Sequence, residues 1–172
     1  MLRMAALVEL FAETGCEDVV TYIQSGNVVY AAEPESAKRV GERIAGAIAT
    51  RHGLKVPVIV RTLREMRQVL AGNPFSRTGA DPKSLHVMFL AEEPEAARVA
   101  GLDPERSPGD SYHVRGREVY LCLARGVSGS KLTNAYFDTK LGTVSTSRNW
   151  QTVLKLVAMC EEGSGRTAIS DR

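Results

Sequence analysis

The sequence has few of the residues from which metal sites and disulfide frameworks are built. It contains three cysteines and three histidines among 172 residues. Cys16, Cys122 and Cys160 are far apart, odd in number and without CxxC spacing, which argues against a disulfide framework and against a zinc site. The three histidines share no metal-ligand spacing. We therefore predict no metal site, and the sequence assigns no cofactor.

Charge of one sign and long apolar runs are also lacking. The chain has 22 basic and 20 acidic residues, a net charge of +2, which gives no bulk electrostatic argument for binding nucleic acid or a membrane. No apolar run approaches membrane-spanning length. Glu9 and Glu13 interrupt the apolar pattern at the start, and no signal-peptide cleavage site follows. These absences predict a cytoplasmic protein whose anionic partners, if any, are held by a local cluster.

Recognisable catalytic signatures are absent as well. The sequence has no GxSxG, no HExxH, no Cys–His spacing and no obvious carboxylate pair. Asp110, Glu118 and Asp138 are available acids, but each is predicted to be exposed. Whether the protein is an enzyme is left open, because a catalytic set assembled from distant residues remains an alternative.

Helix and strand patterns alternate along the chain, which predicts an α+β protein in two halves. Residues 1–72 are predicted to form a helix, a hairpin, a longer helix, a strand and a short helix. Residues 73–84 are dense in glycine and proline and are predicted to be a linker. Residues 85–162 are predicted to form a strand, a helix, a hairpin and two C-terminal helices, and the polar segment 163–172 is predicted to be disordered.

The two halves differ at their beginnings. The second half opens with a strand, and the first half opens with a helix. If the halves are related plaits, the first half lacks its opening strand. Its sheet would then expose backbone donors and acceptors and invite self-association through that edge. The alternative is that the halves are unrelated and nothing is missing.

Several segments carry a family resemblance. They are Thr21-Tyr-Ile-Gln-Ser-Gly-Asn-Val-Val-Tyr30, Asn73-Pro-Phe75, Leu85-His-Val-Met-Phe-Leu90, Ser130-Lys-Leu-Thr133 and Thr146-Ser-Arg-Asn-Trp-Gln-Thr152. With these segments the chain resembles domain-of-unknown-function family 1697. The resemblance implies a duplicated ferredoxin-like architecture and no established activity. Members of the family usually begin with a further strand and a glycine-rich basic loop, so the chain resembles an N-terminally truncated member.

Two short loops rich in Gly, Ser and Thr supply the main candidate site. Each is predicted to enter a helix, over 131–141 and 149–161, and to place a cation in its first turn. A cation at that position opposes the helix dipole and typically costs about 0.3–1 kcal/mol, so a bound anion would explain both choices. Lys131 and Arg148 would supply the charge. The hydrogen bonds would come from Ser130, Thr133 and Asn149, with both cations converging on one anion.

Structural alternatives exist for each part of this site. Ser130 separates Gly129 from Lys131, which rejects a Walker A loop because that motif needs lysine directly after the last glycine. The first loop is equally explained by a capped helix with a solvated lysine. Trp150 is spaced to join the apolar stripe of the last helix, so we assign it to the core rather than to ligand stacking.

The tip of the first hairpin is a third candidate. Gln24 and Asn27 place polar amides around Gly26. The alternative is turn chemistry alone, because asparagine and glycine are what a tight turn requires.

These observations favour a non-catalytic module that binds a small anionic or phosphorylated ligand. One alternative is an enzyme that acts on such a ligand. Another is a single-stranded nucleic-acid-binding protein, since plait sheets can present stacking aromatic residues. The available rings are Tyr22, Tyr30, Tyr112 and Tyr120, but the neutral composition counts against nucleic acid, and no membrane partner is predicted.

Overall fold

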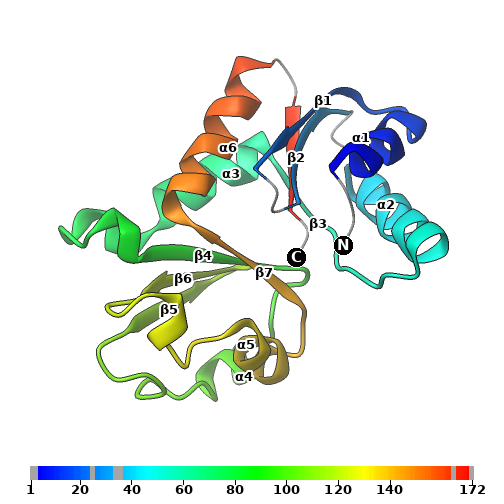
Figure 1. The fold of residues 1–172 in the computed structure, drawn as a ribbon. Helices are drawn as coiled ribbons and strands as arrows, with labels where there is room; N and C mark the ends of the chain where they lie inside the picture. Colours follow the sequence, from blue (N-terminus) through cyan, green and yellow to red (C-terminus); the bar gives the residue numbers. More distant parts are fainter. Residues whose placement is uncertain (1–3, 24–25, 33–36, 164–165, 171–172) are drawn as a thin grey trace. The chain divides into compact units, whose positions relative to one another are not determined.

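The chain divides into two compact units in the computed structural model, which describes residues 4–23, 26–32, 37–163 and 166–170 (Figure 1). The first unit comprises Met1–Gln68 and Leu154–Arg172, and the second comprises Val69–Val153. Both contain helices and antiparallel strands, so the α+β prediction is confirmed. The division falls inside two helices, α3 (Leu63–Gly72) and α6 (Trp150–Glu162).

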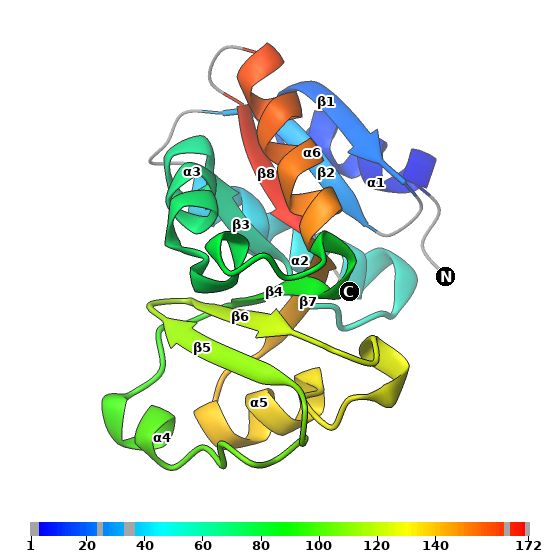
Figure 2. The same cartoon turned by 90° about the vertical axis from the view of Figure 1, so that its left-hand side faces the viewer.

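The first unit is built on a four-stranded antiparallel sheet of order β1-β2-β8-β3. Its elements are α1 (Met4–Glu13), β1 (Glu17–Tyr22), β2 (Asn27–Ala31), α2 (Ala37–His52), β3 (Ile59–Thr62) and β8 (Arg166–Ser170). Helices α1 and α2 cover one face and α6 the other (Figures 1 and 2). Helical spacing brings Leu7 and Phe11 of α1 onto one buried face, where they join Tyr30 and Ile44 in the core.

The predicted disorder of segment 163–172 is wrong over residues 166–170. These residues form β8, which lies between β2 and β3 (Figure 2). Strand edges carry unpaired N–H and C=O groups that must find partners, and β8 supplies them to both neighbours. Helix α1 is the first described element, as predicted for the first half. Strand β8 occupies the interior position expected for the missing strand, and β1 and β3 form the edges of the sheet. Self-association through an edge stays a prediction.

The second unit is built on another antiparallel sheet, of order β5-β6-β4-β7. Its strands are β4 (Leu85–Leu90), β5 (Ser111–Arg115), β6 (Glu118–Cys122) and β7 (Ser145–Asn149). Its helices are α4 (Ala96–Ala100) and α5 (Asn134–Leu141). Strand alternation sends Met88, Leu90, Val119 and Leu121 to the face that packs with Phe137 of α5. All the residues of strand β4 are buried.

The predicted linker 73–84 contains two short 3₁₀ helices, η1 (Pro74–Arg77) and η2 (Pro82–Ser84). Asn73 and Asp81 cap them, each accepting a hydrogen bond from a backbone N–H two residues later. A third 3₁₀ helix, η3 (Val127–Gly129), follows β6. The glycine- and proline-rich segment is therefore ordered by local caps.

Gly72 lies against a buried tyrosine of the same unit, and we expect its replacement by alanine to destabilise the protein. An added Cβ would lie 2.7 Å from Tyr120 Oη, which donates a hydrogen bond to Val69 O at 3.1 Å. We expect Gly72→Ala to lower the free energy of unfolding by about 1–3 kcal/mol. Gly46→Ala is the control, because nothing lies within 4 Å of its Cβ position in α2, and it should stabilise by about 0.5–1 kcal/mol. Urea unfolding of both variants measures the contrast, and equal effects would contradict it.

Candidate functional site

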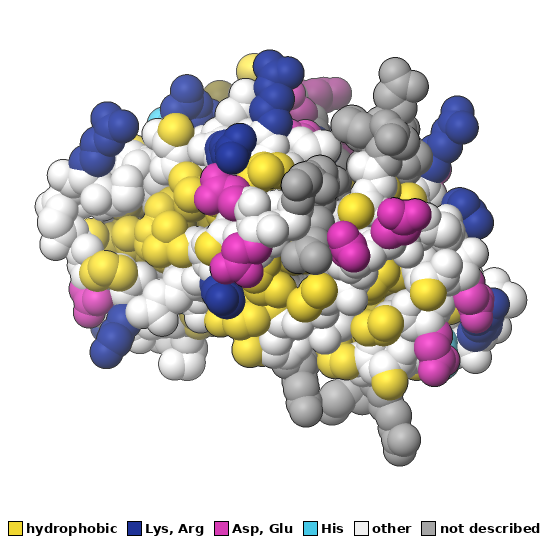
Figure 3. All heavy atoms as spheres, turned by 90° about the horizontal axis from the view of Figure 1, so that it is seen from above, with side chains coloured by type: hydrophobic (Ala, Val, Ile, Leu, Met, Phe, Trp, Pro, Cys, Tyr) yellow, Lys and Arg dark blue, Asp and Glu magenta, His cyan; other side chains and the backbone are white. Residues whose placement is uncertain are grey.

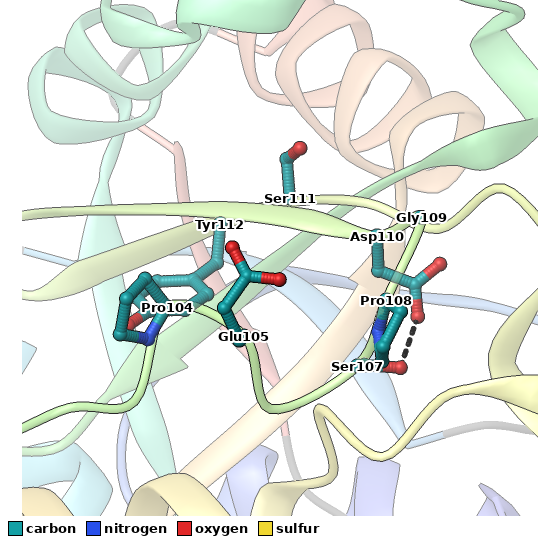
Figure 4. Close-up of a pocket in the computed structure, with 8 residues that line it drawn as sticks. All are labelled: Pro104, Glu105, Ser107, Pro108, Gly109, Asp110, Ser111 and Tyr112. Carbon is teal, nitrogen blue, oxygen red and sulfur yellow. Dashed lines mark hydrogen bonds between the residues drawn. The ribbon is translucent and has the colours of Figure 1, made fainter.

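The loop between α4 and β5 forms a pocket of approximately 490 Å³ in the second unit (Figure 4). Pockets of this size are typical of small-molecule sites. Figure 4 shows Pro104, Glu105 and Tyr112 grouped on one side of the loop and Ser107, Pro108 and Asp110 on the other. The lining residues are Pro104, Glu105, Ser107, Pro108, Gly109, Asp110, Ser111 and Tyr112. Carboxylates, hydroxyls and one aromatic ring therefore line one open, polar pocket.

Asp110 holds this loop in place. Its carboxylate accepts hydrogen bonds from Ser107 Oγ at 2.7 Å and from the backbone N–H of Ala124 at 2.9 Å. Ser107, only 3% exposed, in turn accepts the backbone N–H of Lys131 through Oγ at 3.1 Å. Gly109 permits the sharp approach to Asp110 with a φ of 91°. The pocket loop is thereby fastened to the segment that follows β6.

The surroundings of Asp110 keep its carboxyl group ionised. Partial burial acts to raise its pKa, but hydrogen bonds from Ser107, Ser130 and Ala124 and the positive charge of Arg125 together outweigh burial. The net result is a pKa below the usual value for aspartate. At neutral pH the group is therefore an anion whose charge is shared among fixed donors.

Arg125 brings a cation close to two residues that line the pocket. Its Nη2 donates a hydrogen bond to the carbonyl oxygen of Pro108 at 3.4 Å, and its side chain is exposed. Its charge also acts on Asp110. The guanidinium group is therefore close to two residues that line the pocket, Pro108 and Asp110, and has further hydrogen-bond donors.

Tyr112 forms the apolar side of the pocket. Its ring packs edge-on against Phe137, with ring centroids 5.5 Å apart. Burial, followed by the nearby Tyr136 and Asp103, raises the pKa of Tyr112. The phenol therefore stays protonated at neutral pH and can donate or accept a hydrogen bond.

Two of the predicted ligand-binding residues belong to this network. Ser130 bonds the Asp110 carboxylate and accepts the backbone N–H of Leu132 at 3.0 Å. Lys131 has an exposed side chain, and its backbone N–H is held by Ser107. Thr133 instead caps α5, because its Oγ1 accepts the backbone N–H of Tyr136 at 3.2 Å.

The predicted placement of both cations in first helical turns is wrong. Lys131 precedes the cap residue Thr133 by two positions, and Arg148 lies in strand β7, two residues before α6 begins. Arg148 is 9% exposed, and its Nη1 donates to Thr146 Oγ1 at 2.7 Å and to Ser147 O at 2.8 Å. Neither cation therefore opposes a helix dipole, so the dipole argument no longer gives a reason to expect a bound anion. A joint site of Lys131 and Arg148 stays a prediction.

The remaining predicted residues have separate surroundings. Asn149 Oδ1 accepts the backbone N–H of Thr152 at 2.8 Å, at the start of α6. Asn27 is fully buried in the first unit, and its Nδ2 donates to Tyr22 O across the hairpin at 3.3 Å. Gln24 lies outside the described residues.

Sequence reasoning missed most of the pocket. It placed Asp110 at an exposed position and did not consider Ser107, Glu105 or Arg125. The available signal was the loop around Pro104 and Pro108, whose prolines and acids directly precede a strand. Such loops are where binding residues concentrate, but the partner segment at Ser130 lies some 20 positions further along the chain.

The described part of the chain has neither a candidate metal site nor a candidate membrane-spanning helix. Among residues 4–23, 26–32, 37–163 and 166–170, no group of three or more His, Cys, Asp or Glu side chains could hold a metal ion. The three cysteines are free thiols. No helix among the described residues has the length and apolar character needed to cross a membrane.

Comparison with known proteins gives one match. The sequence model of a family described as "Protein of unknown function (DUF1697)" matches residues 1–120. None of the curated proteins and none of the solved structures compared with the chain matches it. The matched region contains the pocket loop and ends before Arg125 and Lys131.

Proposed function

We propose, on the premise that this chain belongs to the DUF1697 family of proteins of unknown function, that it is a binding module for a small phosphorylated polyol. The observation that carries the proposal is the mixed chemistry of the 104–112 pocket. Carboxylates of Glu105 and Asp110 line it, and Arg125 is hydrogen-bonded to the lining residue Pro108. The proposal refines the small anionic ligand expected from the sequence.

Each chemical group of such a ligand has a possible partner residue in or near the pocket. Hydroxyl groups are donors that suit the Glu105 carboxylate and the free acceptor capacity of Asp110. A phosphate suits the planar guanidinium of Arg125, because an arginine fork binds phosphate oxygens in pairs. Lys131, whose backbone is tied to Ser107, is the second cation that we assign to the phosphate. A purely anionic ligand fits less well because it would meet two carboxylates.

The lining favours binding over catalysis. Among the described residues that line the pocket, there is no histidine, cysteine or lysine. The Ser107 hydroxyl is hydrogen-bonded to the Asp110 carboxylate, whose lowered pKa makes it a weak general base. Nucleic-acid binding is less well supported than binding of a phosphorylated polyol. The face seen in Figure 3 carries Lys and Arg interspersed with Asp and Glu rather than a continuous basic surface.

We further infer that the second unit is a ferredoxin-like plait, as expected from the family resemblance. Its chain order is β4-α4-β5-β6-α5-β7, and its sheet order is β5-β6-β4-β7. The first unit has the corresponding helices and hairpin, with β8 in the position of the opening strand. This correspondence supports a duplicated architecture.

Calorimetric titration tests the proposed ligand. We expect glucose 6-phosphate to bind more tightly than either inorganic phosphate or glucose, because only the phosphorylated sugar offers both chemistries. Arg125→Ala should weaken its binding about tenfold, the equivalent of one charge-assisted contact. The matched control is Arg77→Ala, since Arg77 is an exposed arginine of η1 and should leave affinity unchanged. Equal affinity for glucose and its phosphate, or equal effects of both variants, would contradict the assignment.

A further inference from the structure

The interior strand of the first sheet comes from a distant part of the chain. Thr62, the end of β3, and Arg166, the start of β8, are 104 positions apart (166 − 62). Between them lies the whole of the second unit. Strand β8 pairs with β2 from Asn27↔Ser170 to Ala31↔Arg166 and with β3 from Ile59↔Ser170 to Thr62↔Thr167. It therefore fills a slot whose two walls are β2 and β3.

The walls of this slot are held by packing within the first unit. Tyr30 of β2 and Ile44 of α2 lie in one core cluster, and Val60 of β3 packs against it. Helix α2 approaches β3 so closely that a Cβ on Gly41 would lie 2.8 Å from Val60 Cγ2. Helix α2 thus packs closely on β3 and shares one core cluster with β2.

The connection that leads into β8 is short. Three residues, 163–165, join the end of α6 at Glu162 to the start of β8 at Arg166. A short connection under strain favours exchange of the element that follows it between copies, because the exchanged element keeps its native contacts.

We propose that the slot between β2 and β3 is a strand-binding site that accepts residues 166–170 of a second copy of this chain in place of its own β8. Reciprocal exchange produces a closed, two-fold dimer in which every hydrogen bond of the slot is re-formed. Main-chain pairing supplies the affinity, as in other cases of strand addition. Both walls lie within the family match over residues 1–120, and the strand that fills the slot lies outside it.

The edge formed by β1 is a poorer place for self-association. Strand β1 has a register shift between Glu17 and Val20, and Asp18 within it has a φ of 50°. A bulge twists an edge strand away from regular pairing and protects it from further strands. The slot has no such interruption in its register with β8.

The first experiment uses the dye-labelled full chain with the wild-type sequence of β8. One population of chains carries a donor dye on the C-terminal segment, and a second population carries an acceptor dye on β2. The two populations are mixed at rising concentration. We expect energy transfer to grow with concentration together with a dimer in light scattering. A chain that stays monomeric without energy transfer at every concentration overturns the proposal.

The second experiment uses the full chain with Ala168→Pro, which removes the N–H of the residue that pairs with Val29 and Arg61. A labelled peptide of residues 163–172 should bind this variant at least about tenfold more tightly than it binds the wild type, whose slot is filled. The same peptide with proline at position 168 should not bind. Ala168→Val is the control, because it keeps the N–H and should behave as the wild type.

Hydrogen exchange measures whether β2 and β3 stay folded in Ala168→Pro. Protected amides in both strands, combined with no peptide binding, would overturn the proposal. If this variant does not fold, energy transfer between wild-type chains decides the question alone. Neither readout depends on glucose 6-phosphate, so the result is independent of the proposed ligand.

Discussion

Replacing Phe137 by alanine is expected to lower the free energy of unfolding by about 3–5 kcal/mol, the usual cost of removing a buried phenylalanine. Phe137 is fully buried and packs edge-on against Tyr112 and Tyr136, with ring centroids 5.5 and 5.1 Å away. The substitution leaves a cavity beneath the sheet and removes both aromatic contacts. Urea unfolding followed by the fluorescence of Trp150, the single tryptophan of the chain, measures the loss.

The same substitution should also weaken ligand binding, because Tyr112 lines the pocket and loses the ring that positions it. Val127→Ala is the matched control. Val127 belongs to the same unit but is 64% exposed, so its truncation should change stability by no more than about 0.5 kcal/mol. A Phe137→Ala protein as stable as this control would refute the assignment of Phe137 to the core.

Replacing Asp110 by alanine is expected to destabilise the second unit by about 2–3 kcal/mol at pH 7, the scale of hydrogen bonds to a charged group. Ser107 Oγ and the N–H of Ala124 lose their common acceptor, and Ser107 is buried where water cannot replace it. The loop that shapes the pocket is then no longer fastened to the segment around Lys131. Asp110→Asn should cost less because the amide oxygen can still accept one bond.

The effect of Asp110 depends on pH in a defined direction. The folded protein holds the pKa of Asp110 below its ordinary value of 3.8. The ionised carboxyl therefore stabilises the fold fully above that pH, and its contribution is lost as the pH falls through the lower folded pKa. The difference in urea midpoint between wild type and Asp110→Asn should thus shrink between pH 5 and pH 2. A constant difference over this range would show that the ionised carboxylate is not what holds the loop.

Much of the fold follows from local patterns. The helical spacing of Leu7 and Phe11 predicts α1, and the stripe containing Trp150, Val153 and Val157 predicts α6, where all three side chains are buried. Leu154 belongs to the same predicted stripe but is 44% exposed. Strand β7 was not predicted, because Ser145 to Asn149 contains no alternating apolar residues. Pairing with β4 makes this polar segment a strand, and polar partners within the unit satisfy Arg148 and its neighbours.

Only part of the candidate site could be predicted from the sequence. Ser130 and Lys131 were recognised as unusual in their loop, but their role comes from Ser107 and Asp110, which precede them by some 20 residues. A hydrogen bond across such a separation leaves no periodic signal, because it constrains two positions rather than a repeating pattern. Arg148 was predicted from the sequence to bind a ligand. In the structure its side chain is buried and hydrogen-bonded to Thr146.

The sequence by itself determined the α+β class, the helices with apolar spacing, the hairpins with glycine turns and the family to which the chain belongs. These features depend on residues within a few positions of one another, where side-chain period and turn chemistry act directly. The tertiary structure alone decided that residues 166–170 fill the slot between β2 and β3, that 145–149 is a strand, and that Asp110 fastens the pocket loop. In each case polar backbone or side-chain groups found partners far along the chain, and burial made those partners obligatory.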